Sequence, residues 1–169
     1  MKRVILASAV LALGIGSATA QTPQPADWTI LHFSADSNKP ADVTWERIGG
    51  HDWCGILKFL DRLKGCTINS GTGEVGSVRT VMVGTTATVE MAVARTPLSY
   101  TYAQPYTPIF YHGTMGVEPI DAHHSKIVYT LMWNQTPVGD AAAQAAAREA
   151  RQKSFQAAVD KMAAAANAP

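Results

Sequence analysis

Cysteine is nearly absent from this chain, and neither sign of charge dominates it. Only two of the 169 residues are cysteine, so a metal site made of thiolates alone is excluded. Charged residues make up 16% of the chain and the formal net charge is +1. This balance gives no electrostatic reason to expect nucleic acid or an anionic membrane surface as a partner. The 47% of hydrophobic residues is ordinary for one globular domain with a real core.

The common catalytic motifs are absent as well. There is no GxSxG, no Walker loop and no GxGxxG followed by a helix, which disfavours serine-hydrolase, nucleotide and dinucleotide chemistry. The histidines show no HExxH, HxH or mixed Cys/His spacing, so no metal site is expected. These histidines are His32, His51, His112, His123 and His124.

Long apolar runs are limited to the N-terminus. Lys2 and Arg3 precede an apolar run over 4–15, and Ala-Thr-Ala at 18–20 supplies a small-x-small cleavage site. This pattern is typical of a secretory signal peptide and is too short for a transmembrane helix; a buried N-terminal helix is the weaker alternative. We therefore expect a signal peptide at 1–20, a disordered leader at 21–26, one domain at 27–166, and a soluble periplasmic product without membrane insertion.

Export changes the meaning of the two cysteines. Cys54 and Cys66 lie twelve residues apart, too far for CxxC redox chemistry. An even count in an oxidising compartment predicts a disulfide between them. Such a bond contributes about 3 kcal/mol in the chain-entropy account. Two buried free thiols are the alternative.

The order of secondary structure predicts an α+β fold. A first strand at 28–34 precedes a short helix capped by Asp42 and ending at Gly49-Gly50, then a second short helix at 53–60. Regularly spaced strands follow at 78–83, 88–94, 98–103, 109–117 and 126–133. The Ala-rich segment 140–168 predicts a long helix with Asp140 as N-cap and frayed residues from 163 onward. Phe155, Val159 and Met162 give this helix one apolar stripe, which predicts that it packs on an antiparallel sheet.

Several strings in this order resemble the SRPBCC superfamily, also called START-like or Bet v 1-like, including its polyketide cyclase/dehydratase branch. They are VTWERIG at 43–49, Trp53-Cys54 with Cys66, GSVR at 76–79, LSYTY at 98–102 and SKIVY at 125–129. The exported MxaD-like branch is the most similar, although ILKF at 56–59 replaces the WHP of that branch. The resemblance implies a helix-grip fold, in which a curved antiparallel sheet wraps around the long C-terminal helix and two short helices follow the first strand.

The resemblance also implies a deep cavity for hydrophobic or aromatic molecules, and no metal or organic cofactor. Alternation along the strands predicts that five aromatic residues point inward: Tyr100, Tyr102, Tyr111, Tyr129 and Trp133. A pocket there would stack a ring and bind its substituents. Ordinary core packing is the alternative for each of them. The candidate ligand-binding residues are Trp53, Arg79, Tyr102, Tyr111, Tyr129 and Trp133.

Three residues are candidates for acid–base chemistry: Glu90, Tyr100 and His51. Arg79 and Glu90 are the charges expected in strand interiors, either as a buried pair or with one facing a ligand. An exposed cross-strand pair is equally consistent, because Val89, Met91 and Val93 compete for the inner face. Burial of Glu90 in an apolar pocket would raise its pKa unless Arg79 lies close. His51 lies in a loop beside Trp53, where we expect the cavity mouth.

These observations predict a periplasmic protein with a hydrophobic pocket. Our first expectation is a cofactor-free acid–base enzyme of the lyase, dehydratase or cyclase type acting on a small aromatic or hydrophobic substrate. The alternatives are a carrier for such a ligand and an MxaD-like accessory partner of a periplasmic dehydrogenase. Fold does not separate them, because one scaffold supports many functions.

Overall fold

The computed structural model describes residues 26–169, so the predicted signal peptide and all but the last residue of the predicted leader lie outside the described part. One antiparallel sheet, one long helix and three short helices make up this part. The strands are β1 (Trp28–Ser37), β2 (Leu63–Ser70), β3 (Val78–Val83), β4 (Thr86–Thr96), β5 (Ser99–Ala103), β6 (His112–Pro119) and β7 (Ser125–Asn134). The helices are α1 (Ala41–Arg47), η1 (Gly55–Phe59), η2 (Thr136–Val138) and α2 (Ala141–Asn167), of which η1 and η2 are 3₁₀-helices.

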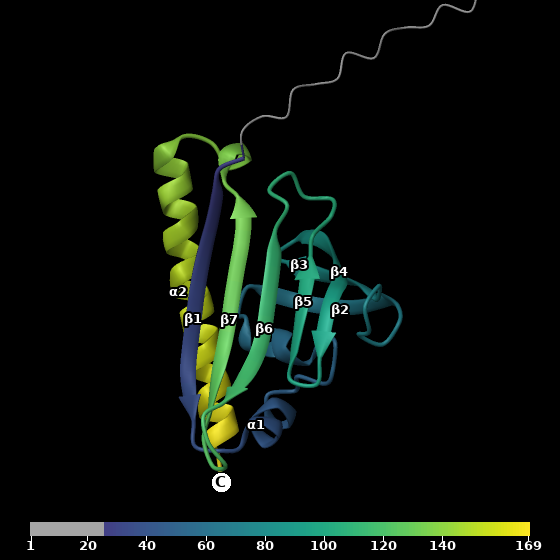
Figure 1. Ribbon diagram of the computed structural model, residues 1–169. Coiled ribbons are helices and arrows are strands. Elements are labelled where there is room, and N and C mark those ends of the chain that lie inside the picture. Colours follow the sequence, from purple (N-terminus) through teal and green to yellow (C-terminus); the bar gives the residue numbers. More distant parts are fainter. Residues whose placement is uncertain (1–25) are drawn as a thin grey trace, which may run out of the picture.

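The sheet has the order β1-β7-β6-β5-β4-β3-β2. Strands β2 to β7 form a meander, and β1 joins antiparallel to β7 along ten paired residues. The sheet curves so strongly that β2, β3 and β4 cross behind the other strands, while α2 runs beside β1 and β7 (Figure 1). This is the predicted helix-grip arrangement, with β1 and β2 left as the two edges.

Strand β2 was missed by the sequence analysis, which placed no strand between the second short helix and 78–83. Its sequence LKGCTINS is mostly exposed and does not alternate between apolar and polar residues, so it carries no strand signal of its own. Pairing with β3, from Leu63 opposite Val83 to Ser70 opposite Val78, makes it a strand. The first strand also extends three residues beyond the expected end, to Ser37.

The short helices differ from expectation in detail. Asp42 is not the cap of α1: Pro40 occupies that position, and the Asp42 carboxylate accepts a hydrogen bond from the amide of Val43 within the first turn. The second short helix is a five-residue 3₁₀-helix, Gly55–Phe59, and not a longer α-helix. Both elements still place their apolar residues in the core.

Helix α2 begins as predicted and ends later. The Asp140 side chain accepts a hydrogen bond from the amide of Ala143 at 2.9 Å, which satisfies one of the free donors of the first turn. Fraying from 163 onward was a wrong prediction, because Ala166 is fully buried and Arg47 donates to the carbonyl groups of Ala166 and Ala168. These contacts hold the last turn against α1.

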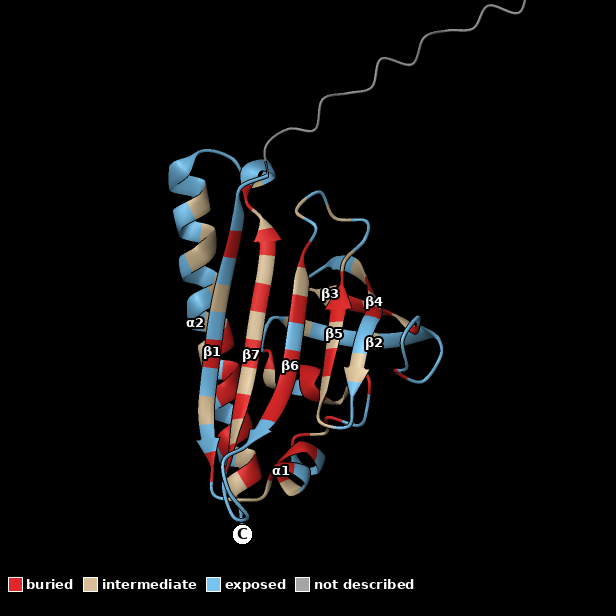
Figure 2. Ribbon diagram, viewed as in Figure 1, coloured by how far each residue is buried: buried red, intermediate tan, exposed pale blue. Residues whose placement is uncertain are grey.

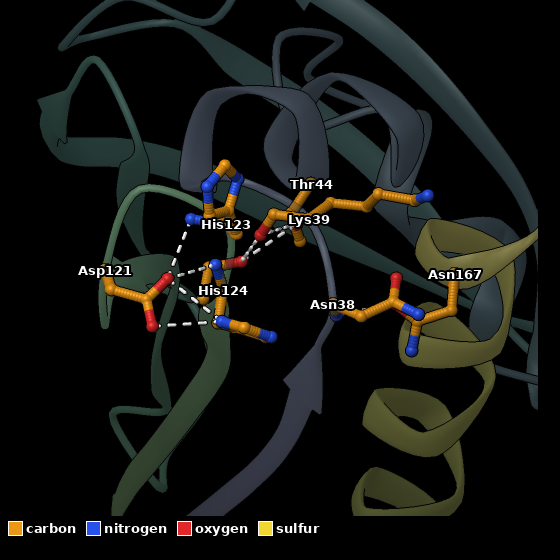
Figure 3. A network of polar contacts seen from close by, with 8 residues as sticks. Asn38, Lys39, Thr44, Asp121, His123, His124 and Asn167 are labelled. Carbon is orange, nitrogen blue, oxygen red and sulfur yellow. Dashed lines mark hydrogen bonds and ion pairs between the residues drawn. The ribbon is translucent and has the colours of Figure 1, made fainter.

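A chain of buried hydroxyl groups closes this end of the molecule. The hydroxyl oxygen of Thr44 in α1 lies 2.8 Å from the hydroxyl oxygens of both Ser37 in β1 and Ser125 in β7. The Ser125 hydroxyl group also donates to the carbonyl group of Lys39. The Asn167 side chain of α2 accepts from the amide of residue 38 (Figure 3). Strands and helices from both ends of the chain are therefore fastened together here.

The turn between β6 and β7 extends from the same end. Asp121 accepts hydrogen bonds from the amides of His123 and His124, and its carboxylate also contacts the His124 ring (Figure 3). Both histidines are exposed, as the sequence predicts for a turn.

The opposite end of α2 is much less covered. The buried residues of the helix begin at Phe155, and the turns before it are exposed or half-buried (Figure 2). The loop between β5 and β6 stands at this same end (Figure 1). Within residues 26–169, no helix combines the length and the apolar character needed to cross a bilayer. The fold is therefore closed at the C-terminus of α2 and open near its N-terminus.

Candidate functional site

Two charged residues lie on the inner face of the sheet. Arg79 of β3 is directly opposite Glu90 of β4, and both are buried, with 0% and 4% of their surface exposed. The Nε and one terminal nitrogen of Arg79 donate to the same oxygen of Glu90, at 2.8 and 2.6 Å. Glu90 therefore faces the interior, and Val89, Met91 and Val93 lie on the other face of β4.

The Arg79 side chain is enclosed by an aromatic shell. Its guanidinium lies 4.0 Å from the ring centre of Trp53 and also contacts Tyr100 and Tyr102, and it donates to the Trp53 carbonyl group. Burial acts to lower the pKa of Arg79, but Tyr100 and Glu90 outweigh it and leave the pKa above its ordinary value. The pair is thus held as a stacked, hydrogen-bonded unit.

Gln104 connects this unit with the open end, and sequence reasoning missed it. Its side-chain nitrogen donates to the second oxygen of Glu90 at 3.0 Å. Both oxygens of the Glu90 carboxylate are therefore occupied. The only signal in the sequence is a polar residue directly after the inward-facing run of β5, which is too common to single it out.

The inward tyrosines fill the depth of the grip, as alternation predicts. The hydroxyl groups of Tyr102 and Tyr129 lie 2.9 Å apart, and Tyr129 packs edge-on against Phe155 of α2. Burial raises the pKa of Tyr100, Tyr102 and Tyr129, so their hydroxyl groups stay protonated. Tyr100 is enclosed with Trp45 and Trp53 and does not line the opening described below.

A cavity of about 260 Å³ opens at the uncovered end of α2. Tyr111 and Ile109 form part of its apolar wall, and Gln104 lies at its inner side. Arg62 and Arg151, which sequence reasoning did not select, bring two positive charges to it. The full lining is Arg62, Val83, Thr86, Thr88, Gln104, Ile109, Tyr111 and Arg151.

The expected mouth beside His51 is not where this cavity opens. The exposed His51 ring packs edge-on against Trp45, 6.3 Å between ring centres, and its carbonyl group accepts from Arg95. Loop residues 49–52 are folded back against α1, because Gly49 adopts a left-handed conformation with φ of 81°. His51 is thus placed outside the buried cluster of Arg79 and Glu90.

Of the six predicted ligand-binding residues, Tyr111 alone lines the cavity, and the other five are buried in the core. Trp133 of β7 is fully buried beneath Arg151, 4.6 Å from the guanidinium to the ring centre, and Tyr111 contacts Tyr102. The predicted disulfide is present: Cys54 and Cys66 are bonded, with their Cα atoms 6.0 Å apart. It ties the loop that carries Trp53 to the edge strand β2.

Comparison with solved structures shows the same fold in proteins of low identity. The Zhui aromatase/cyclase from Streptomyces superposes with a TM-score of 0.67 at 17% identity, covering 83% of this chain and 94% of its own. Ara h 8.0201 superposes with a TM-score of 0.52 at 17% identity, and the match covers 80% of this chain and 98% of its own. A solution structure of a protein from Thermobifida fusca superposes with a TM-score of 0.59 at 19% identity, and the match covers 83% of this chain and 97% of its own. At these identities the likeness establishes the fold alone.

Sequence comparison points in the same direction. Among curated proteins, none matches this chain. The family model described as "Polyketide cyclase / dehydrase and lipid transport" matches residues 30–167, which span β1 to the end of α2. The chain therefore belongs to the polyketide cyclase/dehydrase and lipid transport family of the SRPBCC superfamily, whose members bind hydrophobic small molecules.

Proposed function

We propose that this protein is exported and binds a small aromatic or hydrophobic molecule in the cavity at the open end of α2. The observation that carries the proposal is the cavity itself, which has an aromatic and aliphatic wall of Tyr111, Ile109 and Val83 and polar groups at fixed positions. Family membership supports a hydrophobic ligand. Its volume of about 260 Å³ suits a one- or two-ring molecule better than a long lipid chain.

Ligand binding can be tested by filling the cavity. Thr88 lines it from β4, whereas the neighbouring Ala87 is exposed. A bound aromatic ligand raises the melting temperature by linkage. We expect 2-naphthol to raise the Tm of the wild type and of Ala87→Phe, and to leave the Tm of Thr88→Phe unchanged. Equal ligand-induced shifts in both variants would contradict binding in this cavity.

A second candidate function is a cofactor-free acid–base enzyme. The observation that favours it is the link from the cavity through Gln104 to Glu90, which places a carboxylate one side chain away from a bound molecule. In this candidate, movement of Gln104 frees one Glu90 oxygen to accept a proton from the substrate. Glu90→Gln would lower turnover per folded molecule about 10²- to 10⁴-fold, measured where the variant is still folded. If the protein binds aromatic dimers or hydroxyacyl compounds but turns over none of them, the result would favour a non-catalytic carrier.

Export to the periplasm is the remaining element of the proposal. It is supported by the charged start, apolar run and small-residue site at 1–20. The intact mass of protein isolated from the periplasm should equal that of a chain that begins at Gln21. The MxaD-like accessory role is a different outcome, in which the protein co-purifies with a dehydrogenase and the cavity variants have no effect.

A further inference from the structure

The two arginines that line the cavity have no acidic partner among residues 26–169. Neither Arg62 nor Arg151 forms an ion pair in this part of the chain. The nearby carboxylates are already engaged, since Asp61 pairs with Lys161 at 2.6 Å and Glu90 pairs with Arg79. The cavity therefore carries two positive charges that the protein does not neutralise.

Both guanidinium groups are held in place by aromatic rings. Arg151 lies over Trp133, and the Arg62 guanidinium lies 5.1 Å from the ring centre of Phe155. Stacking of this kind orients a guanidinium while leaving its N–H edge free for an acceptor. A terminal nitrogen of Arg151 donates only to the carbonyl group of Ala147 within its own helix.

Two buried donors at the cavity have no acceptor in the described residues. They are the Nε of Arg151 and the hydroxyl group of Tyr111. An unsatisfied buried donor is costly, and most such groups in proteins have a partner. The Arg151 guanidinium lies 5.9 Å from the ring centre of Tyr111, and Arg62 lines the same cavity, so the three groups converge. An anion bound here would satisfy the donors and relieve the repulsion between the two cations.

We infer that the ligand is an organic acid, with an aromatic or apolar body and one carboxylate. The body would lie against Tyr111, Ile109 and Val83, and the carboxylate would accept from Arg62 and Arg151. A planar carboxylate matches the fork of a guanidinium, and such charge-assisted hydrogen bonds are stronger than neutral ones. This inference rests on the proposed function and adds the chemical class of its ligand.

The test compares two molecules of nearly the same shape by isothermal titration calorimetry: 2-naphthoate, which is charged, and 2-naphthamide, which is neutral. We expect the wild type to bind the acid about 10-fold or more tightly than the amide, the effect of one or two charge-assisted hydrogen bonds. Arg151→Gln and Arg62→Gln should each lower this ratio, because each removes one of the two positive charges that bind the carboxylate. Arg62→Gln, at an exposed position, provides a second variant for which loss of folding is not expected.

The matched control is Arg148→Gln. Arg148 lies one turn away on α2, donates to Gln135 and does not line the cavity. The substitution therefore removes the same charge at a site outside the cavity. The acid preference should persist in this control. Equal affinity for acid and amide in the wild type would overturn the inference and leave the proposed function standing. Binding of neither molecule would overturn both.

Discussion

Arg79 and Glu90 face each other across β3 and β4 and form a fully enclosed ion pair on the inner side of the sheet. Their placement turns Val89 and Met91 outward, against the simple expectation that the most apolar residues of a strand point inward. The two-residue turn at Gly84-Thr85 sets this register, with Val83 opposite Thr86. The charged pair therefore forms part of the core next to the cavity.

Removing one member of this pair should destabilise the fold. Glu90→Gln leaves a buried guanidinium without a compensating charge, and such changes cost about 3–5 kcal/mol of unfolding free energy. Urea denaturation measures the loss. The double variant Arg79→Met/Glu90→Leu should recover most of it, because it removes both charges together. An unchanged midpoint for Glu90→Gln would contradict the structural role.

The disulfide should stabilise the loop that holds Trp53. We expect Cys54→Ser/Cys66→Ser to lower the unfolding free energy by about 3 kcal/mol, because the loop closed by the bond regains its entropy in the unfolded chain. Intact mass of the oxidised native protein should be two hydrogens below the reduced value. Two titratable thiols in that material would refute the bond.

The tyrosines should separate into structural and ligand-contacting groups. Tyr102→Phe removes a hydrogen bond to Tyr129 and should cost about 1 kcal/mol of stability. Tyr111→Phe removes a buried hydroxyl group without a partner, so the stability should not fall. Only Tyr111→Phe should weaken polar aromatic ligands more than apolar ones in calorimetry.

Glu74 should contribute to stability only while it is ionised. Hydrogen bonds from the amide and hydroxyl group of Thr72 lower its pKa from 4.5 to about 2. Because the folded pKa lies below the unfolded one, this contribution is complete above the unfolded value and is lost as the pH falls towards 2. Carboxyl NMR titration should give the low pKa, and Thr72→Ala should raise it. A Glu74 pKa near 4.5 in the wild type would contradict these contacts.

Gly113 should tolerate no side chain. It lies opposite Tyr102 in the sheet, and a Cβ there would collide with the tyrosine ring and hydroxyl group. Gly113→Ala should therefore cost about 1–3 kcal/mol, the usual effect of overpacking. Gly65→Ala is the matched control, because a Cβ in that edge strand makes only ordinary contact with Met82. Thermal unfolding of both variants measures the difference.

Local patterns were sufficient for much of the fold. Period-two alternation placed Tyr100, Tyr102, Tyr129 and Trp133 inside, because successive strand residues point to opposite faces. The Asp140 cap followed from the chemistry of free amide groups at a helix start. Cys54 and Cys66 were the only cysteines, so their pairing needed no knowledge of distant contacts.

The remaining features depend on contacts between distant segments. Strand β2 has no pattern of its own and exists through pairing with β3. Glu90 faces inward because Arg79 lies opposite, a balance of charge pairing against apolar burial that one strand cannot reveal. Arg62 and Arg151 line the same cavity only because Arg62 packs against Phe155 of α2. The sequence by itself therefore determined most of the elements and the inward aromatic faces of β5 and β7. The tertiary structure alone decided the inner face of β4 and which charges line the cavity, because electrostatic interactions depend on distance in space.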